Sequence, residues 1–204
     1  MSSPGPVVGF DLDMTLIDTR PGMRAVISEL NAETGYRIDA AAVAEVLGPP
    51  LDQLLAPWVP QAQMPEVIER FREIYSEVAI EPVAALPGAH EALQAVHEHG
   101  GRVLVLTGKF EPNAERHLKH LDLTHDVLVG SRWARAKADV LVEYAATAYV
   151  GDHPADMRAA CDAGAWAVGV STGGYDAAAL TASGADDVLA SLNEFAPAWQ
   201  RRVS

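Results

Sequence analysis

Short apolar runs alternate with segments of helical period along most of the chain. The runs begin at residues 7, 102, 126, 148 and 166, and a shorter one covers residues 187–189. Continuous apolar runs of this length are typical of strands buried on both faces of a parallel sheet. Proline or glycine marks the ends of the helical segments between them. The pattern therefore predicts an α/β fold, a doubly wound (Rossmann-like) parallel sheet with helices on both faces.

Residues 19–84 interrupt this alternation. Apolar residues after Pro21 and again after Pro65 recur with the period of an amphipathic helix. The first set has the spacing i, i+3, i+4, i+7 and consists of Met23, Val26, Ile27 and Leu30. We therefore expect residues 1–18 and 85–204 to form the α/β core and residues 19–84 to form an all-helical insertion.

The charge balance limits the partners. The 204 residues contain 28 Asp and Glu against 15 Lys and Arg, which gives a formal net charge of −13. A nucleic-acid-binding protein normally carries a basic stripe, and an anionic membrane surface also attracts basic residues. We therefore expect neither partner. A phosphorylated metabolite would need positive charge concentrated locally, which a bound metal can supply.

Cysteine content and hydropathy suggest a cytoplasmic protein. The one cysteine, Cys161, excludes an internal disulfide, and we expect it to be a small core residue. No apolar run approaches the roughly 20 residues that span a membrane, and no secretory signal is visible at the N-terminus. The expected protein is a cytoplasmic monomer or homodimer.

Polar residues that could take part in catalysis follow four of the predicted strands. Because the carboxyl ends of parallel strands meet at one edge of a sheet, these residues can converge on one crevice. In chain order they are Asp11 and Asp13, then Thr107, Gly108 and Lys109, then Lys137, and finally Asp152 and Asp156.

This set of residues suits phosphoryl transfer. Four converging carboxylates would repel one another, and a hard divalent cation such as Mg²⁺ would relieve the repulsion. Thr107 and the Gly108 N–H can donate to phosphate oxygens, and Lys137 adds a positive charge. Successive strand residues point to opposite sides, so Asp11 and Asp13, two positions apart, share a side. One of them can attack phosphorus, and the other can protonate the leaving oxygen.

The same residues resemble the sequence motifs of the haloacid dehalogenase superfamily, in its phosphatase branch. Asp11-Leu-Asp-Met-Thr15, Thr107, Lys137 and Gly151-Asp152 to Asp156 are similar to its four motifs, in order. The helical insertion is similar to that family's type-1 cap, and the turn at residues 48–51 resembles the cap loop of phosphoglycolate-phosphatase-like members.

The resemblance implies a role for each motif residue. Asp11 would be the nucleophile and a Mg²⁺ ligand, and Asp13 the acid and base, binding Mg²⁺ through its backbone carbonyl. Asp152 would bind the metal, and Asp156 would hold it directly or through water. Thr107 and Lys137 would hold the phosphoryl group.

Two further positive residues are candidate substrate contacts. Lys109 follows the second motif directly. Arg24, like Arg20, begins the helical insertion next to the first motif and could meet an anionic leaving group. In the third motif, Ala138 follows Lys137 where many members have proline, so Arg132 and Arg135 also remain candidates there.

These features predict a Mg²⁺-dependent phosphomonoester hydrolase that acts on a small phosphorylated metabolite through an aspartyl phosphate. A sugar phosphomutase of the same superfamily and a catalytically silent binding scaffold are the alternatives. Asp13 argues against a carbon–halogen hydrolase, and the absence of lysine from residues 19–84 argues against a phosphonate hydrolase. A phosphoaspartate signalling receiver would need an Asp at the end of a middle strand, where this chain has Thr107 and Gly130.

Overall fold

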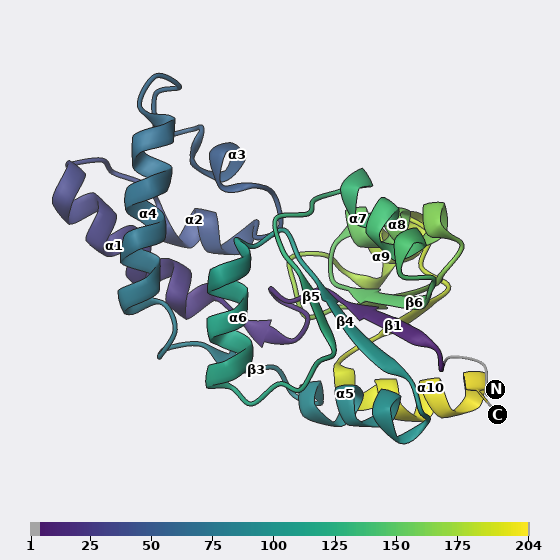
Figure 1. Ribbon diagram of the computed structural model, residues 1–204. Coiled ribbons are helices and arrows are strands. Elements are labelled where there is room, and N and C mark those ends of the chain that lie inside the picture. Colours follow the sequence, from purple (N-terminus) through teal and green to yellow (C-terminus); the bar gives the residue numbers. More distant parts are fainter. Residues whose placement is uncertain (1–4, 204) are drawn as a thin grey trace.

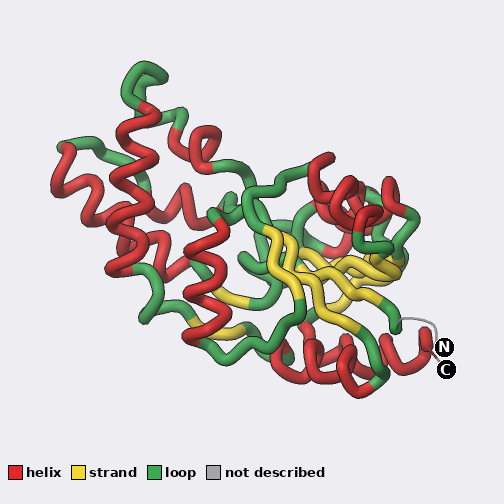
Figure 2. Tube along the Cα trace, in the orientation of Figure 1, coloured by secondary structure: helices red, strands yellow, loops and turns green. Residues whose placement is uncertain are grey.

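A computed structural model describes residues 5–203 and contains a six-stranded parallel sheet (Figures 1 and 2). The strand order is β5-β4-β1-β6-β7-β8, so β1 lies in the middle of the sheet. The register pairs Val8 with Val103 on one side of β1 and with Ala148 on the other. The strands are β1 (Val7–Phe10), β4 (Arg102–Leu106), β5 (Val127–Val129), β6 (Ala146–Gly151), β7 (Trp166–Val170) and β8 (Asp187–Leu189). The predicted α/β fold is confirmed.

Helices cover both faces of the sheet because alternate strand residues point to opposite sides. In β4, Val103 and Val105 pack in one apolar cluster, and Leu104 and Leu106 pack in another. The cluster with Val103 takes in α5 (Ala89–Glu98), α6 (Glu111–His120), the short η1 (Leu192–Glu194) and α10 (Phe195–Val203). The cluster with Leu104 takes in α7 (Arg135–Glu143), α8 (Pro154–Ala163) and α9 (Ala177–Ala182).

The predicted helical insertion forms a separate layer of helices beside the sheet (Figure 1). It has its own apolar cluster, which includes Val26, Leu30, Leu55 and Phe71. The short antiparallel strands β2 (Ile17–Asp18) and β3 (Ala84–Ala85) pair where the chain leaves and re-enters the core. The helices between them are α1 (Arg20–Thr34), α2 (Ala40–Glu45), α3 (Leu51–Leu55) and α4 (Met64–Val78).

Proline begins several of these helices, as the sequence indicates. It occupies one of the first two positions of α1, α4, α6 and α8, where its missing N–H would have no partner within the helix. Within residues 5–203, no helix combines the length and the apolar character needed to cross a bilayer. The expectation for Cys161 is wrong: it is exposed, and its Sγ donates to the Gly184 carbonyl.

Candidate active site

Polar side chains are buried together where the central strands end. Asp11 follows β1, Thr107 follows β4, and Asp152 follows β6, while Lys137 comes from α7 and Asp156 from the first turn of α8. Each of these residues is at most 5% exposed. The parallel sheet therefore brings together residues that lie up to 145 positions apart in the sequence, from Asp11 to Asp156.

Lys137 lies between two of the acids. Its Nζ is 2.7 Å from Asp156 Oδ1 and 3.0 Å from Asp11 Oδ1. Burial opposes the charged form of Lys137, but the two carboxylates outweigh it and raise the pKa of the ammonium. The Tyr149 hydroxyl donates to the Leu106 carbonyl at 2.8 Å and lies 3.4 Å from Asp156 Oδ1. Lys137 is thus held as a fixed positive charge.

Asp11, Asp152 and Asp156 fit a divalent cation. One carboxylate oxygen from each lies within 4.8 Å of the others. Three carboxylates against the one Lys137 ammonium leave two negative charges, which is the charge that a divalent cation neutralises. Asp11 Oδ1 is buried, and its 3.0 Å ion-pair contact with Lys137 does not have hydrogen-bond geometry, so this oxygen can still accept a ligand. Oxygen donors of this kind suit hard cations such as Mg²⁺ or Mn²⁺.

The raised pKa values of Asp11 and Asp152 also indicate that a cation would stabilise their charged forms. Burial, reinforced by Asp156 and Asp13 and only partly offset by Lys137, raises the pKa of Asp11 to about 7. Burial and the neighbouring carboxylates also raise the pKa of Asp152 well above its usual value. A bound cation would reverse both shifts, because it stabilises the charged form.

Small and hydroxyl-bearing neighbours position Asp152 and Asp156. Thr15 Oγ1 donates to Asp152 Oδ1 at 3.2 Å. A Cβ at Gly173 would lie 1.8 Å from Asp152 Oδ2, and a Cβ at Gly151 would lie 2.6 Å from Asp156 Oδ2. Only glycine leaves room for the two carboxylates at these positions.

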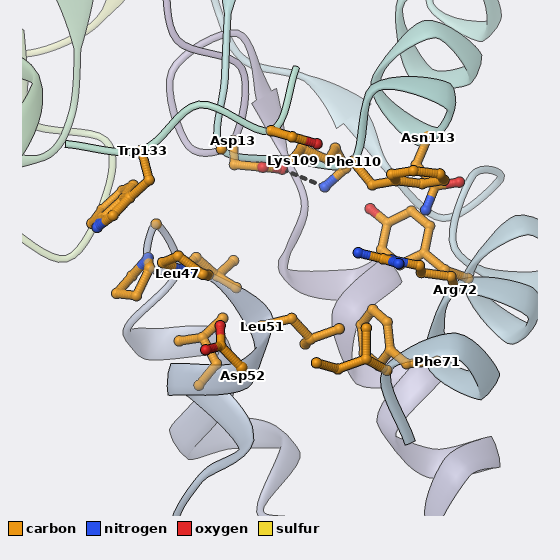
Figure 3. Close-up of a pocket in the computed structure, with 18 of the residues that line it drawn as sticks. Asp13, Leu47, Leu51, Asp52, Phe71, Arg72, Lys109, Phe110, Asn113 and Trp133 are labelled. Atoms are coloured by element: carbon orange, nitrogen blue, oxygen red, sulfur yellow. Dashed lines mark hydrogen bonds and ion pairs between the residues drawn. The ribbon is translucent and has the colours of Figure 1, made fainter. Parts of the chain in front are cut away.

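The Asp13 carboxylate lies outside this group of acids. Its Oδ1 is 2.7 Å from Lys109 Nζ (Figure 3). Burial would raise the pKa of Asp13, but the Lys109 ammonium holds it below its usual value. The same ammonium lies 4.8 Å from the centre of the Tyr75 ring in α4. The structure therefore brings together three of the four predicted acidic side chains, and it pairs the fourth with a lysine.

Tyr75 links the helical insertion to the core beside Asp13. Its hydroxyl shares a 2.8 Å hydrogen bond with Nε2 of His117 in α6. Burial, together with the nearby Lys109 charge, lowers the pKa of His117 to about 3, so this imidazole is neutral. The contact joins α4 to α6 at the edge of the site.

The Thr107 hydroxyl and the backbone turn that follows it lie at the end of β4, the strand beside β1. The Lys109 N–H donates to Thr107 Oγ1 at 3.1 Å, which orients that oxygen and leaves its proton free to donate. The Thr107 N–H donates to the Val129 carbonyl, and the Thr107 carbonyl accepts from Arg132. Gly108 lies in the same turn and is half-buried.

A pocket of about 270 Å³ opens beside Asp13, between the helical insertion and the core. Gly108 and Lys109 line its core side, and α3 and α4 line the other. Arg24 is exposed on α1 and is not among the lining residues, so its predicted contact with substrate has no support here. Arg20 is paired with Asp18 at 2.7 Å.

Sequence reasoning assigned no role to several side chains that shape the site: Thr15, Tyr75, Asn113, His117, Trp133 and Tyr149. Thr15 lies within the first motif, so its place there was the one available signal. The others are ordinary helix, loop or strand residues in the sequence. His153 is the residue that caps the start of α8, where its Nδ1 accepts from the Ala155 N–H.

Comparison with known proteins agrees with this geometry. The family model for haloacid dehalogenase-like hydrolases matches residues 8–170. The chain therefore belongs to this hydrolase family, as its motifs predict.

The chain is similar in sequence to curated phosphatases. It is 27% identical to a phosphoglycolate phosphatase from Salmonella typhimurium, with 94% of this chain and 91% of the relative covered. It is 28% identical to the probable phosphatase IndB of Dickeya dadantii, with 82% of each covered. A haloacid dehalogenase-like hydrolase from Streptococcus pneumoniae has the same fold, with a TM-score of 0.84, 21% identity and coverage of 97% of this chain and 99% of that chain. The predicted enzyme class, a phosphatase, is confirmed.

Proposed function

We propose that the protein is a Mg²⁺-dependent phosphomonoesterase that acts on a small metabolite through a phosphorylated aspartate. The buried group of Asp11, Asp152 and Asp156 with Lys137 carries the proposal, because it combines a nucleophile, a fitting cation site and a fixed positive charge. The residues that would hold Mg²⁺ are these three acids and the backbone carbonyl of Asp13. When bound, the cation would neutralise charge on the acids and on the phosphoryl oxygens.

In the first step, an Asp11 carboxylate oxygen attacks phosphorus, and the bond from phosphorus to the leaving oxygen breaks. Asp13 lies on the pocket side of Asp11. It takes up a proton from solvent and gives it to the leaving oxygen, which returns Asp13 to the carboxylate form that Lys109 favours. Thr107 and Lys137 hold the phosphoryl oxygens during the transfer. The products are the alcohol and a phosphoryl group on Asp11.

In the second step, water attacks the phosphoryl group and Asp13 accepts a proton from it. Lys109 keeps Asp13 in its carboxylate form, which is the form this step requires. Inorganic phosphate leaves, and Asp11 is restored. We propose that residues 19–84 act as a cap that covers the pocket and excludes bulk water during the transfer.

Phosphate release tests the proposal. Small phosphomonoesters should release phosphate with Mg²⁺ and not with a chelator. Asp11→Asn should reduce kcat by at least about 10³-fold, because its amide is a poor nucleophile. Asp162→Asn, a matched change at an exposed aspartate of α8, should leave kcat unchanged. Full activity of Asp11→Asn would refute the assignment of the nucleophile.

The same assay separates the alternatives. A phosphomutase would convert one sugar phosphate into its isomer and release little phosphate. A silent scaffold would neither release nor move the phosphoryl group. Phosphate release with Mg²⁺ in wild type, together with its loss in Asp11→Asn, would exclude both.

A further inference from the structure

The pocket beside Asp13 is where a leaving group would lie during the proposed reaction. It borders Asp13 and Lys109 but does not include Asp11 or Asp152 among its lining residues. Asp13 lines the pocket (Figure 3) and lies two residues after Asp11, so a phosphoryl group at Asp11 would direct the remainder of the substrate toward this pocket. Its volume of about 270 Å³ holds roughly nine water molecules at ~30 Å³ each. That is more space than a two-carbon acid fills.

The cationic side chains that line the pocket are already paired. Lys109 Nζ is 2.7 Å from Asp13 Oδ1, and Arg72 is 2.6 Å from Glu69 Oε1. Asp52 adds a negative charge to the lining. Each of these two cations therefore has a carboxylate partner within the described chain, and the Arg72–Glu69 pair is the more exposed of the two. This balance favours an uncharged leaving group.

Aromatic rings form much of the wall. They come from α4 and from the core loops, and they are Phe71, Tyr75, Phe110 and Trp133. The Arg72 guanidinium lies 4.7 Å from the centre of the Phe110 ring. Phe110 is 40% exposed. Aromatic surfaces of this kind bind flat apolar groups by stacking or edge-on contact.

Asn113 is a largely buried polar side chain that lines the pocket. It is 5% exposed, in the first turn of α6, and it is not among the fully buried polar groups that lack a hydrogen-bond partner in the described chain. A polar group on a ligand could therefore replace the water that its amide meets in the pocket. The side chain lies beside Arg72 at the edge of the pocket (Figure 3). It offers one acceptor and two donors to a ligand there.

We propose that the substrate is a phosphomonoester whose leaving group is an uncharged single ring bearing a hydroxyl or carboxamide group, and that Asn113 recognises that group. The inference rests on the proposed phosphatase function and specifies its substrate class. The aromatic wall would hold the ring, and the Asn113 amide would fix its orientation.

Four primary-alcohol phosphates test this class: ethyl phosphate, 2-phosphoglycolate, benzyl phosphate and 3-hydroxybenzyl phosphate. We expect kcat/KM for benzyl phosphate to exceed that for ethyl phosphate and for 2-phosphoglycolate by at least about tenfold. The ring hydroxyl should add about fivefold to tenfold through one hydrogen bond. Asn113→Leu, of nearly the same size, should abolish the gain from the hydroxyl. Asn193→Leu, at an exposed asparagine outside the pocket, should retain it.

A binding measurement provides a readout that does not depend on turnover. Wild-type protein should bind 3-hydroxybenzyl alcohol, with a change in tryptophan fluorescence from Trp133, about tenfold more tightly than Asn113→Leu does. Asn113→Ala serves as the second variant if the leucine change prevents folding. The comparison among the four esters needs no variant.

The outcomes separate this inference from the proposed function. Phosphate release that favours 2-phosphoglycolate, or that shows no preference for a ring, would overturn the inference and leave the phosphatase intact. A ring preference with an unchanged hydroxyl gain in Asn113→Leu would overturn the role of Asn113. Absence of release from every ester would refute the proposed function, and absence of alcohol binding would then overturn the substrate class as well.

Discussion

Replacing Lys137 by methionine removes the positive charge that contacts Asp11 and Asp156 while nearly keeping the side-chain volume. Lys137 is 1% exposed and lies 2.7 Å from Asp156 and 3.0 Å from Asp11. Removal of one partner from a buried ion pair costs about 3–5 kcal/mol, because the remaining charge has no compensation. That loss is a large part of the roughly 5–15 kcal/mol by which a domain is stable.

Urea unfolding in a chelator at pH 8 measures this loss. At a slope of about 2–3 kcal/mol per molar urea, the midpoint of Lys137→Met should fall by about 1–2.5 M with the slope unchanged. Lys119→Met, a matched change at an exposed lysine of α6, should shift the free energy of unfolding by less than about 0.5 kcal/mol.

The stability difference between Lys137→Met and wild type should depend on pH in a defined direction. Without Lys137, the pKa values of the folded carboxyls rise further above those in the unfolded chain, so the folded variant binds protons that the unfolded chain has released. The difference in stability from wild type should therefore narrow as the pH falls from 8 to 5. A midpoint for Lys137→Met equal to that of Lys119→Met at pH 8 would refute the charged, buried state described for this site.

Three further predictions follow from other contacts. Mg²⁺ at 100 times its dissociation constant should stabilise the fold by about 2.7 kcal/mol, or roughly 5–11 °C in Tm, and Asp152→Asn should remove most of that shift in a thermal scan. Gly173→Ala places a Cβ 1.8 Å from Asp152 Oδ2 and should displace this carboxylate. The Mg²⁺ concentration needed for half of the Tm shift should therefore rise by about 10–100-fold. An unchanged concentration would show that Gly173 does not position Asp152. Because the pKa of His117 is lowered to about 3 while the unfolded value is about 6.5, the unfolded chain binds a proton that the folded chain does not, and stability should fall by a few kcal/mol between pH 6.5 and 3. Urea titrations should show a smaller fall in His117→Gln, and an equal fall would place the acid sensitivity elsewhere.

The sheet could be predicted because its strands are buried on both faces, which leaves an uninterrupted apolar run such as residues 103–106 in the sequence. The prolines in the first turns of α1, α4, α6 and α8 marked the helices for a similar local reason. The positions of Asp11, Thr107 and Asp152 followed from where parallel strands end. Each of these features depends on local sequence and on one topological rule.

Contacts between the helical insertion and the core could not be predicted in this way. The Tyr75–His117 hydrogen bond joins residues 42 positions apart and depends on how α4 lies against α6. Tyr75 has the period of an ordinary core residue, and Asn113 is an ordinary polar residue in the first turn of a helix. Nothing in a single sequence specifies the relative placement of two packed layers at the resolution of a hydrogen bond.

Asp11 and Asp13 show why side-chain geometry is needed to distinguish their roles. Strand alternation predicts that they share a side, yet Asp11 faces Lys137 and two other acids, while Asp13 faces Lys109. Their pKa values are accordingly shifted in opposite directions, upward for Asp11 and downward for Asp13. A nucleophile must be ionised, so Asp11 needs a cation beside it, whereas Lys109 already ionises Asp13. Different environments of two neighbouring carboxyls are what allow them to perform different steps. Here the difference arises from two lysines, Lys137 beside Asp11 and Lys109 beside Asp13.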